Sequence, residues 1–246
     1  MKKILFHINS LEQGGAERVV SNLANRFSID NYEVLVATEW GAEHEFPLQE
    51  RVQRIHVGLT EKEENASRII KACKRVINLR KAVKRERPDI VISFCKANNN
   101  RSILAVMGTK IPLITSVRTN PIGCYDNIKD RIFMALFYKR INGCVFQTIQ
   151  AKEFFNYHLQ KNSKIILNPL NPKYMGINLP SERNHHIVNI ARLEALKNQE
   201  MIIEAFEKIH ELHPEFELFI YGGDAGDGTK KKLERIIHQK KLENFV

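Results

Sequence analysis

Two cations five residues apart, Arg192 and Lys197, are the groups in this sequence most able to do chemistry together. Arg192 follows an apolar run at residues 186–190, and Lys197 comes just before a helical pattern that starts at Gln199. A guanidinium and an ammonium on one strand-to-helix turn can converge on a pyrophosphate, with the amides of the helix N-terminus behind them. The spacing alone is equally typical of two surface cations on a loop.

A second candidate is the pair Gly14-Gly15, which lies between an apolar run at residues 3–8 and a helical pattern at residues 16–27. Adjacent glycines weaken regular structure, so the pair indicates close approach to the backbone. A helix N-terminus at this point offers free amides and a positive dipole end to a phosphate or a sugar. A tight turn is the commoner reason for a lone Gly-Gly, and the absence of G-x-G-x-x-G disfavours a dinucleotide-dependent oxidoreductase.

The elements that must position these residues alternate between apolar strands and amphipathic helices. We expect strands at residues 3–8, 32–38, 54–57, 89–94, 112–117, 143–147 and 164–167, and helices at 16–27, 68–87, 98–107, 129–140 and 151–158. Strands that are apolar throughout and separated by helices predict an α/β fold with a parallel sheet covered on both faces.

The alternation stops at residues 168–184, which read as a linker, and then begins again. The second series predicts strands at residues 186–190 and 216–221, helices at 199–212 and 230–239, and the start of another strand at 244–246. We therefore expect two domains, residues 1–180 and 181–246, with the boundary between Asn171 and His185. Two strands and two helices are too few to complete a sheet covered on both faces, so the second domain is expected to be incomplete.

Composition excludes several classes of protein. The apolar fraction of 43% supports a core, and no run of about eighteen apolar residues predicts a membrane span. The four cysteines form no C-x-x-C pair and no export signal is evident, so we expect reduced thiols in a cytoplasmic protein. The histidines have no metal-ligand spacing, and no G-x-S-x-G nucleophile elbow occurs.

The formal net charge of +10 suits nucleic acid, an anionic membrane surface or phosphorylated small molecules. Much of it lies in a basic amphipathic helix at residues 68–87. A solvated outer face is the first interpretation of this helix, and contact with a membrane surface is the second. The stretch at residues 131–140 is a further candidate for membrane contact. Nucleic acid is disfavoured, because no aromatic side chains are interleaved with the cations.

Several short motifs occur in a fixed order along the chain: Gly14-Gly15-Ala16-Glu17, SVRTNP at residues 116–121, Asn168-Pro169, Ala191-Arg192-Leu193 with Lys197-Asn198, QEMIIEAF at residues 199–206, and Tyr221-Gly222-Gly223. Together they resemble glycosyltransferase family 4, over residues 3–246. The resemblance implies the GT-B architecture, in which two Rossmann-like domains face each other across a cleft. It also implies retaining transfer of a sugar from a nucleotide-sugar donor.

The resemblance implies a role for each matching residue. Arg192 and Lys197 would be the catalytic cations, which hold the donor diphosphate and stabilise its charge as the glycosidic bond breaks. That task can replace a metal ion, so neither a metal nor another cofactor is expected. The remaining donor-side candidates are Gly14 and Gly15, whose loop would lie against the donor phosphates and the acceptor, and Gly222 and Gly223, which would border the nucleotide pocket. The acceptor-side candidates are Arg118 and Asn120.

Members of the family also carry a later Glu-x7-Glu segment and a final helix that returns to the first domain. The sequence stops before both, so the chain is expected to be a fragment or the product of an interrupted gene, and to be inactive in this form.

The favoured function is transfer of a sugar from a nucleotide sugar to a saccharide or polyprenyl-linked acceptor in bacterial surface polysaccharide synthesis. Such an enzyme would be cytoplasmic and could be peripheral on the inner face of the plasma membrane. One alternative is a nucleotide-sugar epimerase of the same architecture. The motif Arg192-Leu193 with Lys197-Asn198 favours the transferase over this alternative. Another is a non-catalytic truncated remnant.

Overall fold

The computed structural model describes residues 1–12, 14–170, 175–176 and 183–246 of the chain. The chain divides into two compact units, Met1–Asn171 and Pro172–Val246. The boundary expected at residues 180 and 181 lies outside the described residues, as does most of the expected linker. Each unit is described below by itself.

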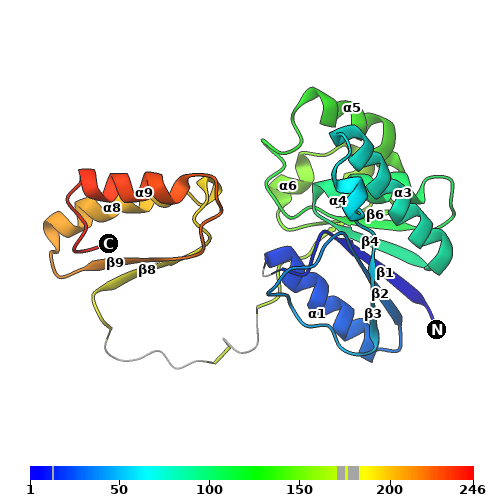
Figure 1. Ribbon diagram of the computed structural model, residues 1–246, viewed down its shortest axis with the longest axis horizontal. Helices are drawn as coiled ribbons and strands as arrows, with labels where there is room; N and C mark the ends of the chain where they lie inside the picture. The colour runs from blue at the N-terminus through cyan, green and yellow to red at the C-terminus, as the bar shows by residue number, and fades with distance from the viewer. Residues whose placement is uncertain (13, 171–174, 177–182) are drawn as a thin grey trace. The chain divides into compact units, whose positions relative to one another are not determined.

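Unit 1 is built on one sheet of seven parallel strands, in the order β3-β2-β1-β4-β5-β6-β7 (Figure 1). The strands are β1 (Lys3–Ile8), β2 (Glu33–Thr38), β3 (Val52–His56), β4 (Ile90–Phe94), β5 (Leu113–Ser116), β6 (Gly143–Phe146) and β7 (Ser163–Ile165). Parallel neighbours need long crossover connections, which here are mostly helical. The expected parallel α/β unit is therefore present.

The helices of unit 1 lie on both faces of this sheet, with α1 on one face and α3 and α4 on the other (Figure 1). They are α1 (Gly15–Ile29), α2 (Glu61–Glu64), α3 (Arg68–Glu86), α4 (Lys96–Val106), α5 (Ile128–Phe137), the 3-10 turn η1 (Tyr138–Arg140), α6 (Ile149–Glu153) and α7 (Tyr157–Lys161). This arrangement follows from the strands, since both of their faces are apolar.

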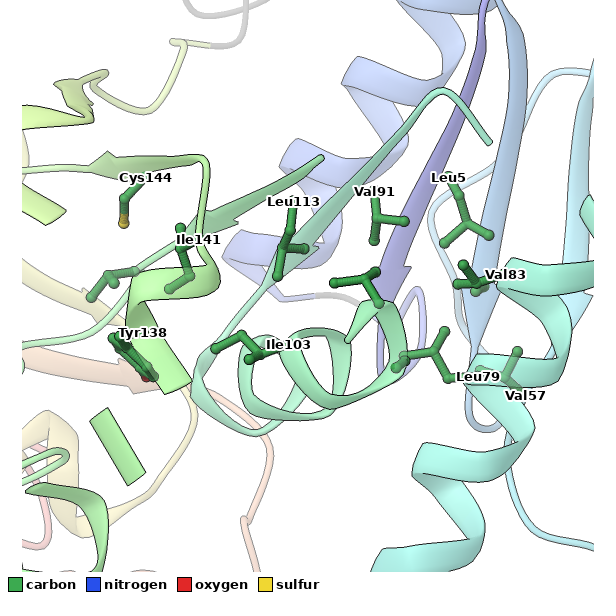
Figure 2. Close-up of a cluster of buried hydrophobic side chains, with 14 of the residues drawn as sticks. Leu5, Val57, Leu79, Val83, Val91, Ile103, Leu113, Tyr138, Ile141 and Cys144 are labelled. Atoms are coloured by element: carbon green, nitrogen blue, oxygen red, sulfur yellow. The ribbon is translucent and has the colours of Figure 1, made fainter. Parts of the chain in front are cut away.

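Alternate residues of each central strand enter different cores. On β1, Ile4 and Phe6 pack with α1, whereas Leu5 packs with the helices of the opposite face. In that second core, the helix side chains of Leu79, Val83 and Ile103 face the strand side chains of Leu5, Val91 and Leu113 (Figure 2). Two buried faces account for the continuous apolar runs in the sequence.

The strand order identifies where a ligand should bind. The sheet grows outward from β1 in both directions, to β2 on one side and to β4 on the other. The connection after β1 passes over the face of α1, and the connection after β4 passes over the opposite face. Ligands of open parallel sheets bind beyond the carboxyl ends of the strands at such a switch point.

Unit 2 contains two parallel strands, β8 (His186–Ile190) and β9 (Glu217–Tyr221). The 3-10 turn η3 (Ala195–Lys197) leads into α8 (Gln199–Leu212), and α9 (Thr229–Gln239) follows β9. Both helices lie on the same face of the two strands (Figure 1), where Phe206 and Leu218 are buried.

Three details of the expected secondary structure are wrong. The helix predicted at residues 151–158 is two short helices, because the side chain of Asn156 accepts a hydrogen bond from the amide of Leu159 and starts a new one. Residues 244–246 form a turn instead of a strand, because Phe245 packs in the core of unit 2. The short helix α2 was not expected, although Thr60 and Glu63 form a capping box at its start.

Candidate functional site

The segments that follow β4 and β5 are joined by a backbone hydrogen bond at the carboxyl edge of the sheet of unit 1. The amide of Cys95, after β4, donates to the carbonyl of Ser116 on β5 at 3.3 Å. Cys95 has a left-handed φ of 70°, which is uncommon for a residue with a Cβ and concentrates at functional sites. Burial, with the nearby charge of Glu17, raises the pKa of its thiol to about 11, so the thiol is neutral at neutral pH.

Arg118 is held in place by groups from two other parts of the chain. Its guanidinium donates to the Oδ1 atom of Asn168 at 2.8 Å and lies 5.5 Å from the centre of the Phe94 ring. Burial lowers the pKa of Arg118, and the nearby carboxylate of Glu17 opposes that change. The side chain therefore extends toward the start of α1, and Asn168 of the Asn-Pro motif is its hydrogen-bond partner.

A cavity of about 340 Å³ opens beside Arg118, beyond the carboxyl ends of β5 and β6. It is lined by Val117, Arg118, Thr119, Asn120, Pro121, Gln147, Thr148, Gln150 and Ala151. Apart from Arg118, the polar side chains of this lining are neutral amides and hydroxyls, which suit the hydroxyl groups of a sugar. Both acceptor-side candidates are thus brought to one cavity.

The segment after β6 was not identified from the sequence as part of the site. Gln147, Thr148 and Gln150 lie there because β6 is the parallel neighbour of β5, and the two carboxyl ends meet at one edge. The signal available in the sequence was their position directly after an apolar strand, the same position that Arg118 has after β5.

The two glycines after β1 differ in their surroundings. Gly14 is the N-cap of α1 with an extended backbone, and a Cβ there would lie 2.1 Å from the Oε2 atom of Glu17. Gly15 has open space around it. The carboxylate of Glu17 therefore occupies the space beside Gly14 that a side chain would fill, at the positive end of the helix dipole. Neither glycine has a left-handed φ. What these glycines provide is therefore space, and not a special backbone conformation.

A buried cluster of charged side chains supports the loops after β1 and β2. Glu39 follows β2, and its carboxylate forms ion pairs with Arg101 of α4 and with Arg75 of α3, the latter at 3.1 Å. The Glu39 side chain is only 1% exposed. Arg101 also donates to the side chain of Asn9 at 3.3 Å, and the carbonyl of Asn9 accepts from the amide of Glu39 at 2.7 Å. The cluster thus ties the loop that follows β1 to the loop that follows β2.

His7 of β1 completes this cluster as a neutral imidazole. Its Nδ1 atom lies 2.9 Å from the hydroxyl of Ser102, and its Nε2 atom lies 3.7 Å from Glu39. Burial, with the charge of Arg101, lowers the pKa of His7, although Glu39 opposes this change. Burial by itself raises the pKa of Glu39, but His7, Arg101 and Arg75 outweigh that effect and hold its pKa below the usual value. Sequence patterns did not identify this cluster, because its members come from four separate segments.

Lys96 fastens the loop that carries the acceptor-side candidates. Its ammonium pairs with Asp130 at the start of α5, donates to the carbonyl of Cys124, and lies 5.2 Å from the centre of the Tyr125 ring. These contacts join the start of α4 to the end of the 117–127 loop. Asn120, in the same loop, accepts a hydrogen bond from the amide of Ile122 at 3.1 Å.

In unit 2, Arg192 and Lys197 converge on one anionic atom. The Oε1 atom of Glu194 lies 3.4 Å from the guanidinium of Arg192 and 3.8 Å from the ammonium of Lys197. The Arg192 side chain is 71% exposed and that of Lys197 is 43% exposed. Both cations can therefore reach a single negatively charged oxygen while remaining open to solvent.

The turn that carries these cations has a defined geometry. The side chain of Gln199, the first residue of α8, donates to the carbonyl of Arg192 at 2.8 Å. Asn198 has a left-handed φ of 52° and directs the chain from η3 into the helix. Both cations therefore lie in the turn that precedes the start of α8, next to the free amides of its first turn.

Gly222 and Gly223 lie against the same turn from β9. A Cβ on Gly222 would be 1.8 Å from the carbonyl oxygen of Ala191, so this position admits only glycine without movement of the backbone. The carbonyl of Gly223 accepts from the amide of Leu193 at 2.9 Å. The two donor-side segments of unit 2 are thus brought together, next to Arg192.

The described residues contain neither a grouped set of metal ligands nor a helix able to cross a membrane. Among residues 1–12, 14–170, 175–176 and 183–246, no three His, Cys, Asp or Glu side chains are grouped so that they could hold a metal ion. Within the same ranges, each helix is too short or too polar to cross a membrane.

Comparison of the sequence with known families gives two adjoining matches. Residues 13–172 match the family described as Glycosyltransferase Family 4. Residues 171–246 match the family described as Glycosyl transferases group 1. The first match alone covers more than half of the chain.

Two curated relatives are glycosyltransferases. One is the GalNAc-alpha-(1->4)-GalNAc-alpha-(1->3)-diNAcBac-PP-undecaprenol alpha-1,4-N-acetyl-D-galactosaminyltransferase of Campylobacter jejuni, which is 27% identical over 230 residues, 92% of this chain and 62% of the relative. The other is an uncharacterized glycosyltransferase of Methanocaldococcus jannaschii, 28% identical over 204 residues, 72% of this chain and 48% of the relative. The chain thus spans about half to three fifths of the length of these relatives.

The solved structures confirm the fold class predicted from the sequence, an α/β fold of the GT-B type. Anabaena Alr3699/HepE in complex with UDP-glucose superposes with a TM-score of 0.77 at 17% identity, over 100% of this chain and 68% of that one. Sucrose-phosphate synthase from Thermosynechococcus elongatus superposes with a TM-score of 0.73 at 11% identity, over 100% and 69%. With the family match over residues 13–172, the chain belongs to Glycosyltransferase Family 4.

Proposed function

We propose that the protein is a retaining glycosyltransferase that moves a sugar from a nucleotide-sugar donor to a saccharide or polyprenyl-linked acceptor. In this proposal residues 1–180 form the acceptor-side domain and residues 181–246 belong to the donor-side domain. The relatives support both substrate classes, since HepE was solved with UDP-glucose and the Campylobacter enzyme is named for an undecaprenol-linked glycan.

The observation that carries the proposal is the convergence of Arg192 and Lys197 on one oxygen of Glu194. When the bond between a sugar and a nucleoside diphosphate breaks, negative charge develops on the diphosphate. Two cations aimed at one anionic position stabilise that charge without a metal ion, and the amides at the start of α8 add to the field. Glu194 stands where the diphosphate oxygen would lie.

For the acceptor, we propose the cavity beside Arg118. Its neutral amides and hydroxyls would bind sugar hydroxyls, and Arg118 and Asn120 would orient them. A saccharide bound there lies at the carboxyl edge of the sheet, where Gly14 and Gly15 begin α1. We place this activity in bacterial surface polysaccharide synthesis, in the cytoplasm at the inner face of the plasma membrane.

The test is a transfer assay of the protein with a panel of UDP-sugars and undecaprenyl-diphosphate-linked acceptors. We expect acceptor-dependent product with the anomeric configuration of the donor, read by NMR. Conversion of the donor to its epimer without acceptor would support the epimerase alternative. Absence of both reactions with every donor would contradict the proposal.

The role of Arg118 is tested with a variant in the same assay. Arg118→Ala should raise the acceptor KM with little effect on the KM for the donor, whereas an equal effect on both would remove Arg118 from the acceptor side.

A further inference from the structure

Helix α5 has apolar side chains on two opposite sides. Its inner side, with Phe133, Met134 and Phe137, packs against the core of unit 1. Its outer side carries three large aliphatic side chains that remain exposed: Ile128 at 69%, Ile132 at 54% and Leu136 at 57%. None of its ten residues, all of them described, is buried. A surface helix normally has one apolar side that faces the core, so a second apolar side calls for an apolar partner.

The exposed residues form a continuous stripe. Ile128, Ile132 and Leu136 follow one another at intervals of four residues, so each lies only about 40° around the helix from the one before. At about 100° per residue, Lys129 lies beside one border of this stripe and Arg131 beside the other. We call the three aliphatic side chains the α5 stripe. An apolar stripe bordered by cations is typical of helices that lie in a membrane interface.

A second group of cations lies where α5 ends. Lys139 and Arg140 of η1, with Lys110 from the loop before β5, line a cavity of about 390 Å³ at the amino edge of the sheet. This cavity is on the opposite edge of the sheet from the cavity beside Arg118. No acidic side chain lines it, and among the described residues none lies within 4.0 Å of these three cations. Asp130 is the one acidic residue of α5, and its carboxylate forms an ion pair with Lys96.

Helix α3, the more basic of the two helices, is different because most of its cations already have partners. Lys71, Lys74, Arg75 and Arg85 form ion pairs with described glutamates, and Arg80 donates to backbone carbonyls near the end of α4. Cations in such contacts must lose a partner to bind a membrane. Within the described part of the chain, the cations in and after α5 have no such ion pair to lose.

We infer that the α5 stripe, together with Lys129, Arg131, Lys139, Arg140 and Lys110, is a docking surface for an anionic lipid bilayer. The charge of this surface selects the occupant. A second copy of the chain would bring the same five cations face to face across a two-fold interface, where like charges repel. A bilayer of anionic lipids takes up the aliphatic side chains in its interface and supplies phosphates to the cations and to the cavity. The inference does not depend on glycosyl transfer.

Co-sedimentation of the full chain with vesicles tests this surface directly. Vesicles of phosphatidylglycerol and phosphatidylcholine are compared with vesicles of phosphatidylcholine alone, at low and at 0.5 M salt. We expect binding to anionic vesicles that falls at least about tenfold in high salt, because surface attraction is screened over about a Debye length.

Three variants locate the surface. Ile128→Ser with Ile132→Ser and Leu136→Ser should weaken binding at least about tenfold, and Lys139→Gln with Arg140→Gln should do the same. The matched control is Lys81→Gln with Lys84→Gln on α3, which removes the same charge from exposed positions and should change binding less than twofold. All seven positions are exposed, so each variant should remain folded, which thermal unfolding checks.

Each other outcome overturns the inference. Equal binding to neutral and anionic vesicles would show that charge plays no part, and an equal loss in the α3 control would show a diffuse effect of net charge. Saturable binding of inorganic phosphate that Lys139→Gln with Arg140→Gln abolishes, without vesicle binding, would make the cavity a site for a free anion. A dimer in sedimentation velocity that the stripe variant dissociates would make α5 a protein interface.

Discussion

Two glutamates of this chain each join two cations, yet their surroundings make them opposites. Glu39 in unit 1 pairs with Arg75 and Arg101 and is 1% exposed, whereas Glu194 in unit 2 pairs with Arg192 and Lys197 beside open solvent. A buried pair costs about 3–5 kcal/mol when one partner is removed, while an exposed pair contributes about 0–1 kcal/mol. Burial thus makes Glu39 part of the fold, and exposure leaves the cations of Glu194 free to exchange partners.

The largest effect is expected for Glu39→Ala. The change leaves Arg101 and Arg75 without their carboxylate, so the free energy of unfolding should fall by about 3–5 kcal/mol. Urea unfolding of the full chain measures this. Glu45→Ala is a suitable comparison, because Glu45 pairs with Arg54 at a more exposed position and should cost less. Equal losses for the two variants would contradict the distinction between buried and exposed pairs.

The next effect concerns function rather than stability. In the transfer assay, Arg192→Ala should reduce donor affinity or turnover at least about tenfold, since a charge-assisted contact contributes about 1.5–3 kcal/mol. Lys197→Ala should behave similarly. Because both side chains are exposed, neither change should shift the unfolding midpoint appreciably. Unchanged kinetics in both variants would remove these cations from the donor site.

Acid should weaken unit 1 through His7. The pKa of His7 in the fold lies below its ordinary value of 6.5, so below that pH the unfolded chain binds a proton that the folded chain does not. Stability contributed by the neutral imidazole is therefore present above pH 6.5 and is lost as the pH falls, by at most about 1.4 kcal/mol per pH unit. Urea midpoints between pH 8 and pH 5 report this slope. His7→Asn should flatten it, and an unchanged slope would show that other groups cause it.

The smallest effect is expected for Glu194→Gln. An exposed ion pair contributes little, so the free energy of unfolding should change by less than about 0.5 kcal/mol. Donor affinity should stay the same or improve, because the change removes the anion that competes with the diphosphate. Isothermal titration with UDP and UDP-sugars measures it. A loss of affinity as large as that of Arg192→Ala would mean that Glu194 contacts the donor itself.

The sequence predicted most of the strands and helices, because the continuous apolar runs of its strands and the amphipathic pattern of its helices are both strong. The strands at residues 3–8 and 186–190 and the helix at residues 199–212 agree with the structure to the residue. The single helix expected at residues 151–158 failed because the pattern of apolar residues continues through Asn156, while the Asn156 side chain interrupts the helix. Local hydrogen bonds from one side chain can therefore override periodicity.

The candidate site was predicted only in part. Arg118 and Asn120 were found from a motif, but Gln147, Thr148 and Gln150 depend on β6 lying next to β5. Likewise, the positive charge of α3 was visible in the sequence, while its ion pairs with Glu63 and Glu64 arise from the packing of α2 against α3. For this reason a count of cations ranked α3 above α5 as a membrane contact, and the structure favours the reverse order.

The sequence by itself determined the parallel α/β class, the family and the residues at each strand-to-helix turn, because these depend on local pattern and short motifs. Only the tertiary structure decided which charged side chains are held inside the fold and which remain able to bind a ligand. Asn9, Arg75 and Arg101 are far apart in the chain and gather around the buried Glu39, whereas Arg192 and Lys197 are close in sequence and remain exposed around Glu194. The strength of an ion pair depends on how much water surrounds it, and burial is a property of the folded molecule that no short stretch of sequence contains.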